Sequence, residues 1–321
     1  MRIMSSRLVL VLLVLAMAVV PLFVSSGYQL FQFTMVVAYA LAVLGVNLVT
    51  GYNGQISLGH GAFYAIGAYV TAIMMDHWDL PYWSTLPVAA VICAGVGFLL
   101  GLPALRLGGL YLALTTLALA AAVPQLLKYD LFEGWTGGVQ GISIIKPDAP
   151  FGLPLNADQW LYLFSFAVAV VLFISAWNLV NGRIGRALKA IRDQPLAAEA
   201  MGIDLAQLKT RTFAASAMYT GIAGSIAAIA VQFVSPDSFA SALSITLFVG
   251  MVVGGAASIS GAVFGALFIQ FIPNIADQVS KAAPGAVYGL ILIVFMFVAP
   301  GGIASLVRKW WPAGGSRARS T

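Results

Sequence analysis

Amide, hydroxyl and imidazole side chains gather between residues 47 and 60, in a stretch that is otherwise apolar. They are Asn47, Asn53, Gln55, Ser57 and His60. Glycines interrupt the same stretch, so a helix would break there, and we expect the break near 51–61. A broken helix here would bare backbone groups that could contact a carboxylate or an ammonium group. The pattern therefore makes the five residues candidates for a polar site beside a water-filled cavity.

A packing role is the alternative for the same stretch. The glycines would then only let helices approach closely, and the short polar side chains would cap helix ends. A single histidine such as His60 is also more often a packed core residue than a ligand or a proton relay.

A second pattern lies in the loop at 181–212. Pro195 suits the first position of a helix and Gly202 suits a helix stop. Asp204 with Gln207 resembles a capping box that starts the next helix. Between them we expect a stiff two-turn helix, about 10 Å long. Its apolar knob would consist of Leu196, Ala197, Ala200 and Met201.

Such a knob is suited to docking a partner protein in the manner of a helix in a groove. It would pass the partner's motion to the two helices that it connects. The alternative is a surface helix that folds back on the protein's own core.

Enzyme signatures are missing from the sequence. It has no GxxxxGK[ST] phosphate loop, no HExxH and no CxxC, and Cys93 is its single cysteine. We therefore expect no catalytic residue, no metal ligand and no cofactor in this chain, which is not an enzyme.

Composition points to the membrane. The chain has 321 residues, of which 61% are hydrophobic and 8% charged, against about 25% charged in soluble domains. This excludes a soluble enzyme, a disordered chain and a nucleic-acid-binding protein. The sequence predicts an all-α polytopic membrane protein in the lipid bilayer, with a single domain over 1–321 and a membrane region over about 8–303.

About ten membrane-spanning helices are expected. A spanning helix needs about 20 mostly apolar residues. The stretch 243–276 is too long for one span and breaks at 254–261, which gives two arms. The predicted spans are 8–25 (not cleaved), 29–50, 57–75, 84–104, 108–127, 160–180, 213–233, the two arms of 243–276, and 285–303.

The charges orient these spans. With both termini in the cytoplasm, 13 of the 16 basic residues lie inside, and only Lys128, Lys146 and Lys281 lie outside. This agrees with the positive-inside rule. It predicts a periplasmic loop at 128–158, a cytoplasmic loop at 181–212 and a basic cytoplasmic tail at 304–321. No charged residue lies deep in a span, which argues against a proton- or sodium-driven carrier.

Three GxxxG pairs lie in the predicted spans. They are Gly97/Gly101, Gly250/Gly254 and Gly261/Gly265. Such pairs let helix backbones approach closely. We expect packing within the chain, with an interface to a second, similar membrane chain as the alternative.

Four motifs, taken together, resemble a known family. AAEAMG looks like the coupling loop of bacterial ABC importer permeases. GYNGQISLGHGAFYAIGAYV (51–70), GRALKAIRDQPLAAEAMGI (185–203) and MVVGGAASISGAVFGALF (251–268) resemble the branched-chain amino-acid branch. TGGVQGI (136–142) resembles its LivM-type subunit rather than the LivH-type one. The resemblance covers about residues 35–300.

The resemblance implies a permease subunit of an ATP-driven ABC importer for leucine, isoleucine and valine or close analogues. It implies the bacterial inner membrane and several partners: two ATP-binding subunits that bind the ATP, a second LivH-like permease, and a periplasmic amino-acid-binding protein. The resemblance also implies that the segment 51–70 lines or flanks the translocation path, which makes the five polar residues named above candidates for lining that path. In that family the coupling loop docks into a groove of the ATPase. The carried-over coupling residues are Pro195, Leu196, Ala197, Ala198, Glu199, Ala200, Met201 and Gly202.

Two alternatives stay open. Importers of urea, short-chain amides or aromatic acids share these motifs. A stand-alone channel for a small neutral solute would also fit a membrane region without charges, but it would have little need of a capped apolar helix at 195–202.

Overall fold

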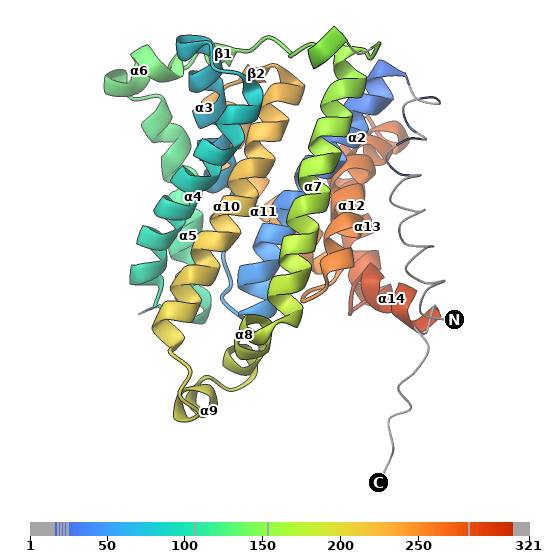
Figure 1. Ribbon diagram of the computed structural model, residues 1–321. Helices are drawn as coiled ribbons and strands as arrows, with labels where there is room; N and C mark the ends of the chain where they lie inside the picture. Colours follow the sequence, from blue (N-terminus) through green and yellow to red (C-terminus); the bar gives the residue numbers. More distant parts are fainter. Residues whose placement is uncertain are drawn as a thin grey trace.

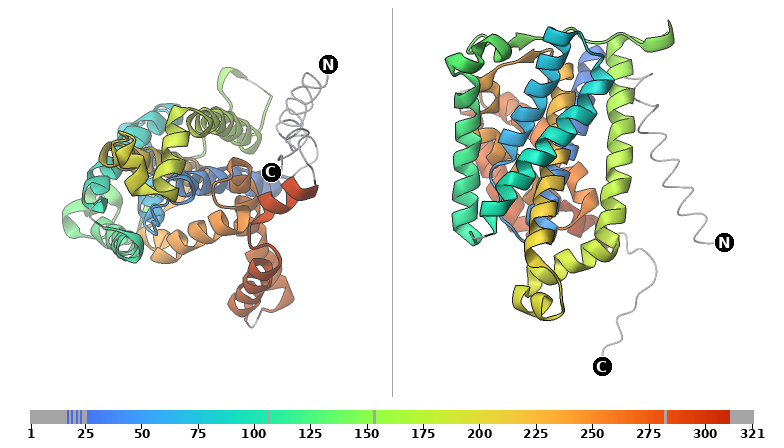
Figure 2. Two further views of the ribbon diagram at one scale, coloured as in Figure 1. Left: turned by 90° about the horizontal axis from the view of Figure 1, so that it is seen from below. Right: turned by 60° about the vertical axis from the view of Figure 1, so that its left-hand side comes forward.

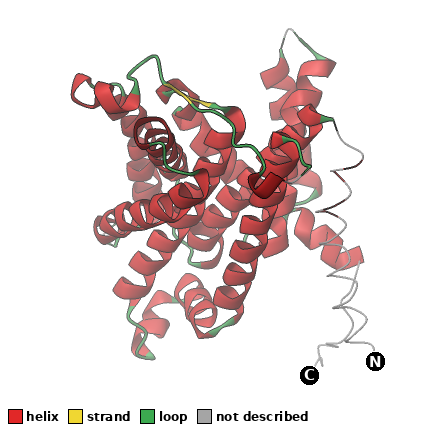
Figure 3. Cartoon of the chain, turned by 45° about the horizontal axis from the view of Figure 1, so that its top comes forward, coloured by secondary structure: helices red, strands yellow, loops and turns green. Residues whose placement is uncertain are grey.

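The computed structural model describes residues 26–105, 107–152, 154–281 and 283–310, together with residues 17, 19, 21 and 23. Long helices run between two ends of the molecule, and the strands among the described residues form one short pair (Figures 1 and 3). We call the end that carries the strands the β end and the opposite end the α9 end. The predicted span 8–25 and the tail beyond residue 310 fall almost entirely outside the described residues.

The elements follow in chain order. The helices are α2 (Gly27–Val46), α3 (His60–Trp78), α4 (Tyr82–Ala104), α5 (Gly109–Leu127), α6 (Asp130–Thr136), α7 (Ala157–Asn181), α8 (Arg183–Asp193), α9 (Pro195–Ala200), α10 (Leu205–Val231), α11 (Ser241–Gly254), α12 (Ile259–Val279), α13 (Pro284–Val298) and α14 (Ile303–Trp310). The other elements are a π-helical turn (Asn47–Tyr52), strands β1 (Ile142–Ser143) and β2 (Phe233–Val234), and 3₁₀ turns at Pro150–Gly152 and Pro236–Phe239.

Helix α10 forms the centre of the bundle. It packs against α2, α3 and α4, and almost all of it beyond Thr210 is buried. Its glycines allow backbones to touch: a Cβ atom at Gly67 of α3 would overlap the backbone of Gly221. By contrast, α13 has no buried residue. Since lipid is as apolar as a protein core, such a bare helix is stable in a bilayer.

The three GxxxG pairs pack within the chain, as expected. Gly97 and Gly101 of α4 face α10, whereas Gly250, Gly254, Gly261 and Gly265 bring α11 and α12 together. The face-to-face glycines let these two short arms lie almost backbone to backbone.

Both predicted helix breaks are present. Helix α2 continues into the π-helical turn, residues 53–59 are irregular, and α3 begins at His60. Helix α11 ends at Gly254 and α12 begins at Ile259. We call 53–59 the first break and 255–258 the second break. The π-helical turn itself was not expected from the sequence.

Eight helical segments of the described chain are long and apolar enough to cross a membrane, so the chain is an all-α, multi-pass membrane protein. They correspond to eight of the ten predicted spans. The predicted span 57–75 is α3, which has 19 residues but is less apolar because it contains His60, Asp76 and His77. The total of ten spans and their orientation stay predictions.

Strand pairing and ion pairs close the β end. Strand β1 pairs antiparallel with β2, with Ile142 opposite Val234. Lys128 pairs with Asp237 at 2.5 Å, and Lys146 pairs with Asp158 at 2.6 Å. The predicted outer loop is thereby fixed to the segment that follows α10.

Candidate functional site

Asn47 joins the two broken segments. Its side chain is fully buried. Its Nδ2 donates to the Ser258 carbonyl oxygen at 2.7 Å, and its Oδ1 accepts from the Ala257 backbone N–H at 2.8 Å. Irregular backbone leaves such groups without helical partners, so one amide side chain satisfies both. Asn47 therefore fastens the π-helical turn to the second break.

His60 lies in a buried hydrogen-bond chain. Its Nε2 is 2.6 Å from Ser216 Oγ, which donates to the Gly45 carbonyl oxygen at 2.6 Å. Its Nδ1 is 3.3 Å from Ser57 Oγ. Since the Ser216 proton goes to the carbonyl, Nε2 must donate to Ser216 and Nδ1 must accept from Ser57. These hydrogen bonds tie the start of α3 to α2 and α10.

The remaining polar residues of the first break bond mostly to one another. Asn53 Nδ2 donates to Gln55 Oε1 at 2.6 Å, and Thr50 Oγ1 donates to the Gln55 carbonyl oxygen at 3.0 Å. Asn53 Oδ1 is buried and has no hydrogen-bond partner among the described residues. All five predicted path residues thus gather around the first break, and the structure shows their packing contacts. A role in the translocation path stays a prediction for them.

Helix α8 rests against the same break. Arg192 Nη1 donates to the Gly51 carbonyl oxygen at 3.0 Å, and its Nε donates to Asp193 Oδ1 at 3.0 Å. The Lys189 ammonium lies 5.8 Å from the centre of the Tyr52 ring, which is cation–π range. Sequence reasoning did not find these contacts, because no local pattern links residue 192 to residue 51.

Helix α9 forms the tip of the α9 end (Figures 1 and 2). Pro195 is at its start, Gly202 has a φ of +82° just after it, and Asp204 accepts a hydrogen bond from the Gln207 N–H. The predicted helix is therefore present, together with the residues predicted to start it, to stop it and to begin the next helix.

The knob of α9 is uncovered. Leu196 is 81% exposed and Met201 is 83% exposed, whereas Ala198 is buried. An apolar pair exposed this far, at the tip of the molecule, is a candidate docking surface.

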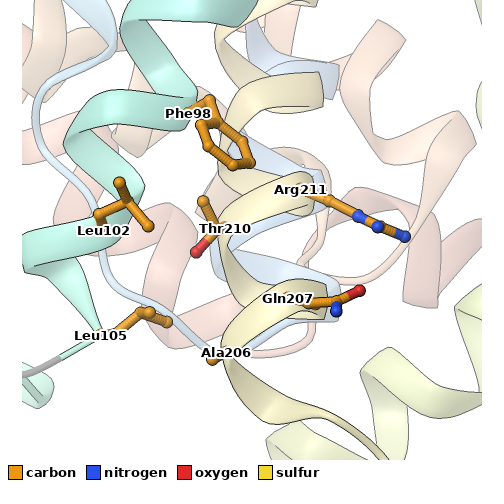
Figure 4. A pocket seen from close by; sticks show the side chains of 7 residues that line it. All are labelled: Phe98, Leu102, Leu105, Ala206, Gln207, Thr210 and Arg211. Carbon is orange, nitrogen blue, oxygen red and sulfur yellow. The ribbon is translucent and has the colours of Figure 1, made fainter.

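A surface groove of about 330 Å³ lies nearby, between the end of α4 and the start of α10. Figure 4 shows Phe98, Leu102 and Leu105 on one side, with Gln207 and Arg211 directed away from them. The wall is thus apolar and the charge is at the rim. The described residues hold no group of three or more His, Cys, Asp or Glu that could bind a metal ion.

Comparison with known proteins gives a consistent result. The family model described as "branched-chain amino acid transport system / permease component" matches residues 28–299. The high-affinity branched-chain amino acid transport system permease protein LivM of Salmonella typhimurium is 32% identical over 326 residues, which cover 94% of this chain and 73% of that protein. LivM of Escherichia coli K12 is 32% identical over 327 residues, with the same coverage.

A second type of permease also matches. LivH of Salmonella typhimurium is 26% identical over 294 residues, which cover 83% of this chain and 90% of that protein. No solved structure matches the chain.

Proposed function

The chain belongs to the family of branched-chain amino acid transport permease components, and we propose that it is the membrane subunit of an ATP-driven importer of leucine, isoleucine and valine. Its greater identity with LivM of Salmonella typhimurium than with LivH of the same organism agrees with the LivM-type motifs in the sequence. The relatives of both types indicate a permease pair, so the second permease would be a LivH-like chain. The two ATP-binding subunits and the periplasmic binding protein complete the proposed assembly in the bacterial inner membrane.

The single observation that carries the coupling role is the exposed knob of α9, held at the α9 end by a proline start and a left-handed glycine. In the proposed orientation this end faces the cytoplasm. The ATPase would receive residues 195–202 in a groove, and the rest of the cytoplasmic loop at 181–212 would hold this segment in place. ATP would be bound and hydrolysed by the partner subunits.

Motion of α9 would reach the membrane through α10. That helix has 27 residues, about 40 Å at 1.5 Å per residue, and runs through the core to the β end. When the ATPase pair closes on α9, α10 and α8 would tilt and access would switch from the periplasm to the cytoplasm. The substrate would meet few polar groups, among them the candidates around the first break, because selectivity is left to the binding protein.

Reconstitution tests this function. The chain, a LivH-like permease and the ATPase subunits are placed in liposomes with the binding protein, and uptake of leucine and of urea is measured with and without ATP. We expect leucine uptake that requires ATP. Urea uptake, or leucine flux that persists without ATP, would contradict the proposal.

Gly202 tests the coupling helix. A side chain at φ +82° is strained by about 1–2 kcal/mol, so Gly202→Asp should shift α9 and reduce uptake while membrane insertion is unchanged. Gly108→Asp is the matched control, because Gly108 has no atom within 4 Å of a built Cβ and an ordinary φ. Normal uptake in Gly202→Asp would remove the coupling role from α9.

A further inference from the structure

A charged contact joins the coupling segment to the membrane interior. Arg192 lies at the end of α8, one residue before the link to α9, and its Nη1 donates to the Gly51 carbonyl oxygen. The last carbonyls of a helix lack backbone donors, so the guanidinium supplies one at the end of the π-helical turn. Hydrogen bonds from a charged donor are about twice as strong as neutral ones.

The contact is close as well as charged. A Cβ atom built on Gly54 would lie 3.3 Å from the Arg192 Cβ, so α8 touches the first break backbone to backbone. Leu188 and Ile191 are buried, at 0% and 1% exposure, and fix α8 in the bundle.

The same turn continues to the second break. Gly51 adjoins Asn47, whose side chain binds the backbone of residues 257 and 258. Helix α14 is packed there too, because a Cβ atom built on Gly255 would lie 3.3 Å from the Cβ of Ala304. An unbroken series of hydrogen bonds and contacts thus leads from α9 and α8 through both breaks.

We propose that Arg192 is the positioning residue through which motion of α9 reaches the broken helices. Through Gly51 and Asn47 it moves the first and second breaks as one unit. The proposal rests on the proposed function, since it concerns how ATP hydrolysis is converted into transport. Arg192 itself need not touch substrate or ATPase.

The positioning role of Arg192 is tested in the reconstituted complex. The quantity measured is the transport ratio, which is the amount of leucine taken up per ATP hydrolysed. In Arg192→Ala the subunits should assemble and hydrolyse ATP, but the ratio should fall about tenfold, since a hydrogen bond to a charged group is worth at least that factor. Arg186→Ala is the matched control on α8: Arg186 is exposed and its side chain has no hydrogen bond or ion pair to any described residue. An unchanged ratio in Arg192→Ala would overturn the proposal.

A disulfide gives a test that does not depend on how Arg192→Ala folds. The built Cβ of Gly54 lies close to the Cβ···Cβ range of a disulfide with residue 192. In Gly54→Cys/Arg192→Cys, the reduced protein should have a low ratio, and oxidation should restore it by re-fastening α8 to the first break. Gly54→Ala/Arg192→Cys, treated with the same oxidant, controls for strain at residue 54, where φ is +75°.

The outcomes separate the two proposals. A ratio that stays low after complete disulfide formation, verified by mass, overturns the role of Arg192. Absence of ATP-dependent leucine uptake by the unmodified complex overturns the proposed function instead.

Discussion

Asn47 is the residue on which the joining of the two breaks depends. A polar residue at membrane depth is often assigned to the substrate, and the sequence supported that assignment here. In the structure both ends of its amide are hydrogen-bonded to backbone groups more than 200 positions away. The sequence alone indicates that a polar residue at position 47 is important. It does not reveal the hydrogen-bond partners of Asn47, because they come from a distant segment.

Removal of the Asn47 side-chain amide should lower the stability of the protein. Asn47→Ala leaves the Ala257 N–H and the Ser258 carbonyl unpaired in a part-buried place, and an unpaired group costs up to about 1–3 kcal/mol. We expect a loss of about 2–4 kcal/mol in stability, seen as a lower unfolding midpoint in detergent. Thr115→Ala is the control, since Thr115 is exposed and its hydroxyl bonds only to Tyr111 of its own helix. Equal midpoints for the two variants would contradict the linking role.

At the scale of elements, the sequence predicts the starts and ends of helices correctly where the signals are local. Pro195, Gly202 and Asp204 end or begin helices as their types predict, and the Gly-rich stretches break helices near both expected positions. The π-helical turn Asn47–Tyr52 has no such local signal, and its side-chain contacts come from distant elements: Asn47 binds the backbone of residues 257 and 258, and Arg192 of α8 donates to the Gly51 carbonyl oxygen.

The packing of α3 on α10 gives a test at this scale. A Cβ at Gly67 would overlap the Gly221 backbone, so Gly67→Ala must separate two core helices, and overpacking costs about 1–3 kcal/mol or more. The yield of monodisperse protein in size exclusion should fall sharply. Gly95→Ala on α4 has open space around the new methyl and should be neutral or slightly stabilising. If the two yields are similar, the close approach of α3 and α10 is wrong.

For the whole molecule, composition and hydropathy were sufficient to predict a helical membrane protein, and apolar length identified most spans. The arrangement of the helices around α10 could not be read in this way. Nearly every span is apolar on all sides, so no amphipathic pattern says which face is buried. Small residues determine which face of a helix is buried, through contacts between distant segments such as that of Gly67 with Gly221.

Orientation also belongs to the whole molecule, and two exposed residues at opposite ends test it. Ile145 near the β end is 87% exposed and Leu196 on α9 is 81% exposed, whereas the native Cys93 is fully buried and should not react. We expect a membrane-impermeant maleimide added to intact spheroplasts to label Ile145→Cys and not Leu196→Cys. In inverted vesicles the labelling should be reversed. Since ATP-binding subunits lie in the cytoplasm, labelling of Leu196→Cys from outside would place α9 out of their reach and leave the coupling helix without a partner.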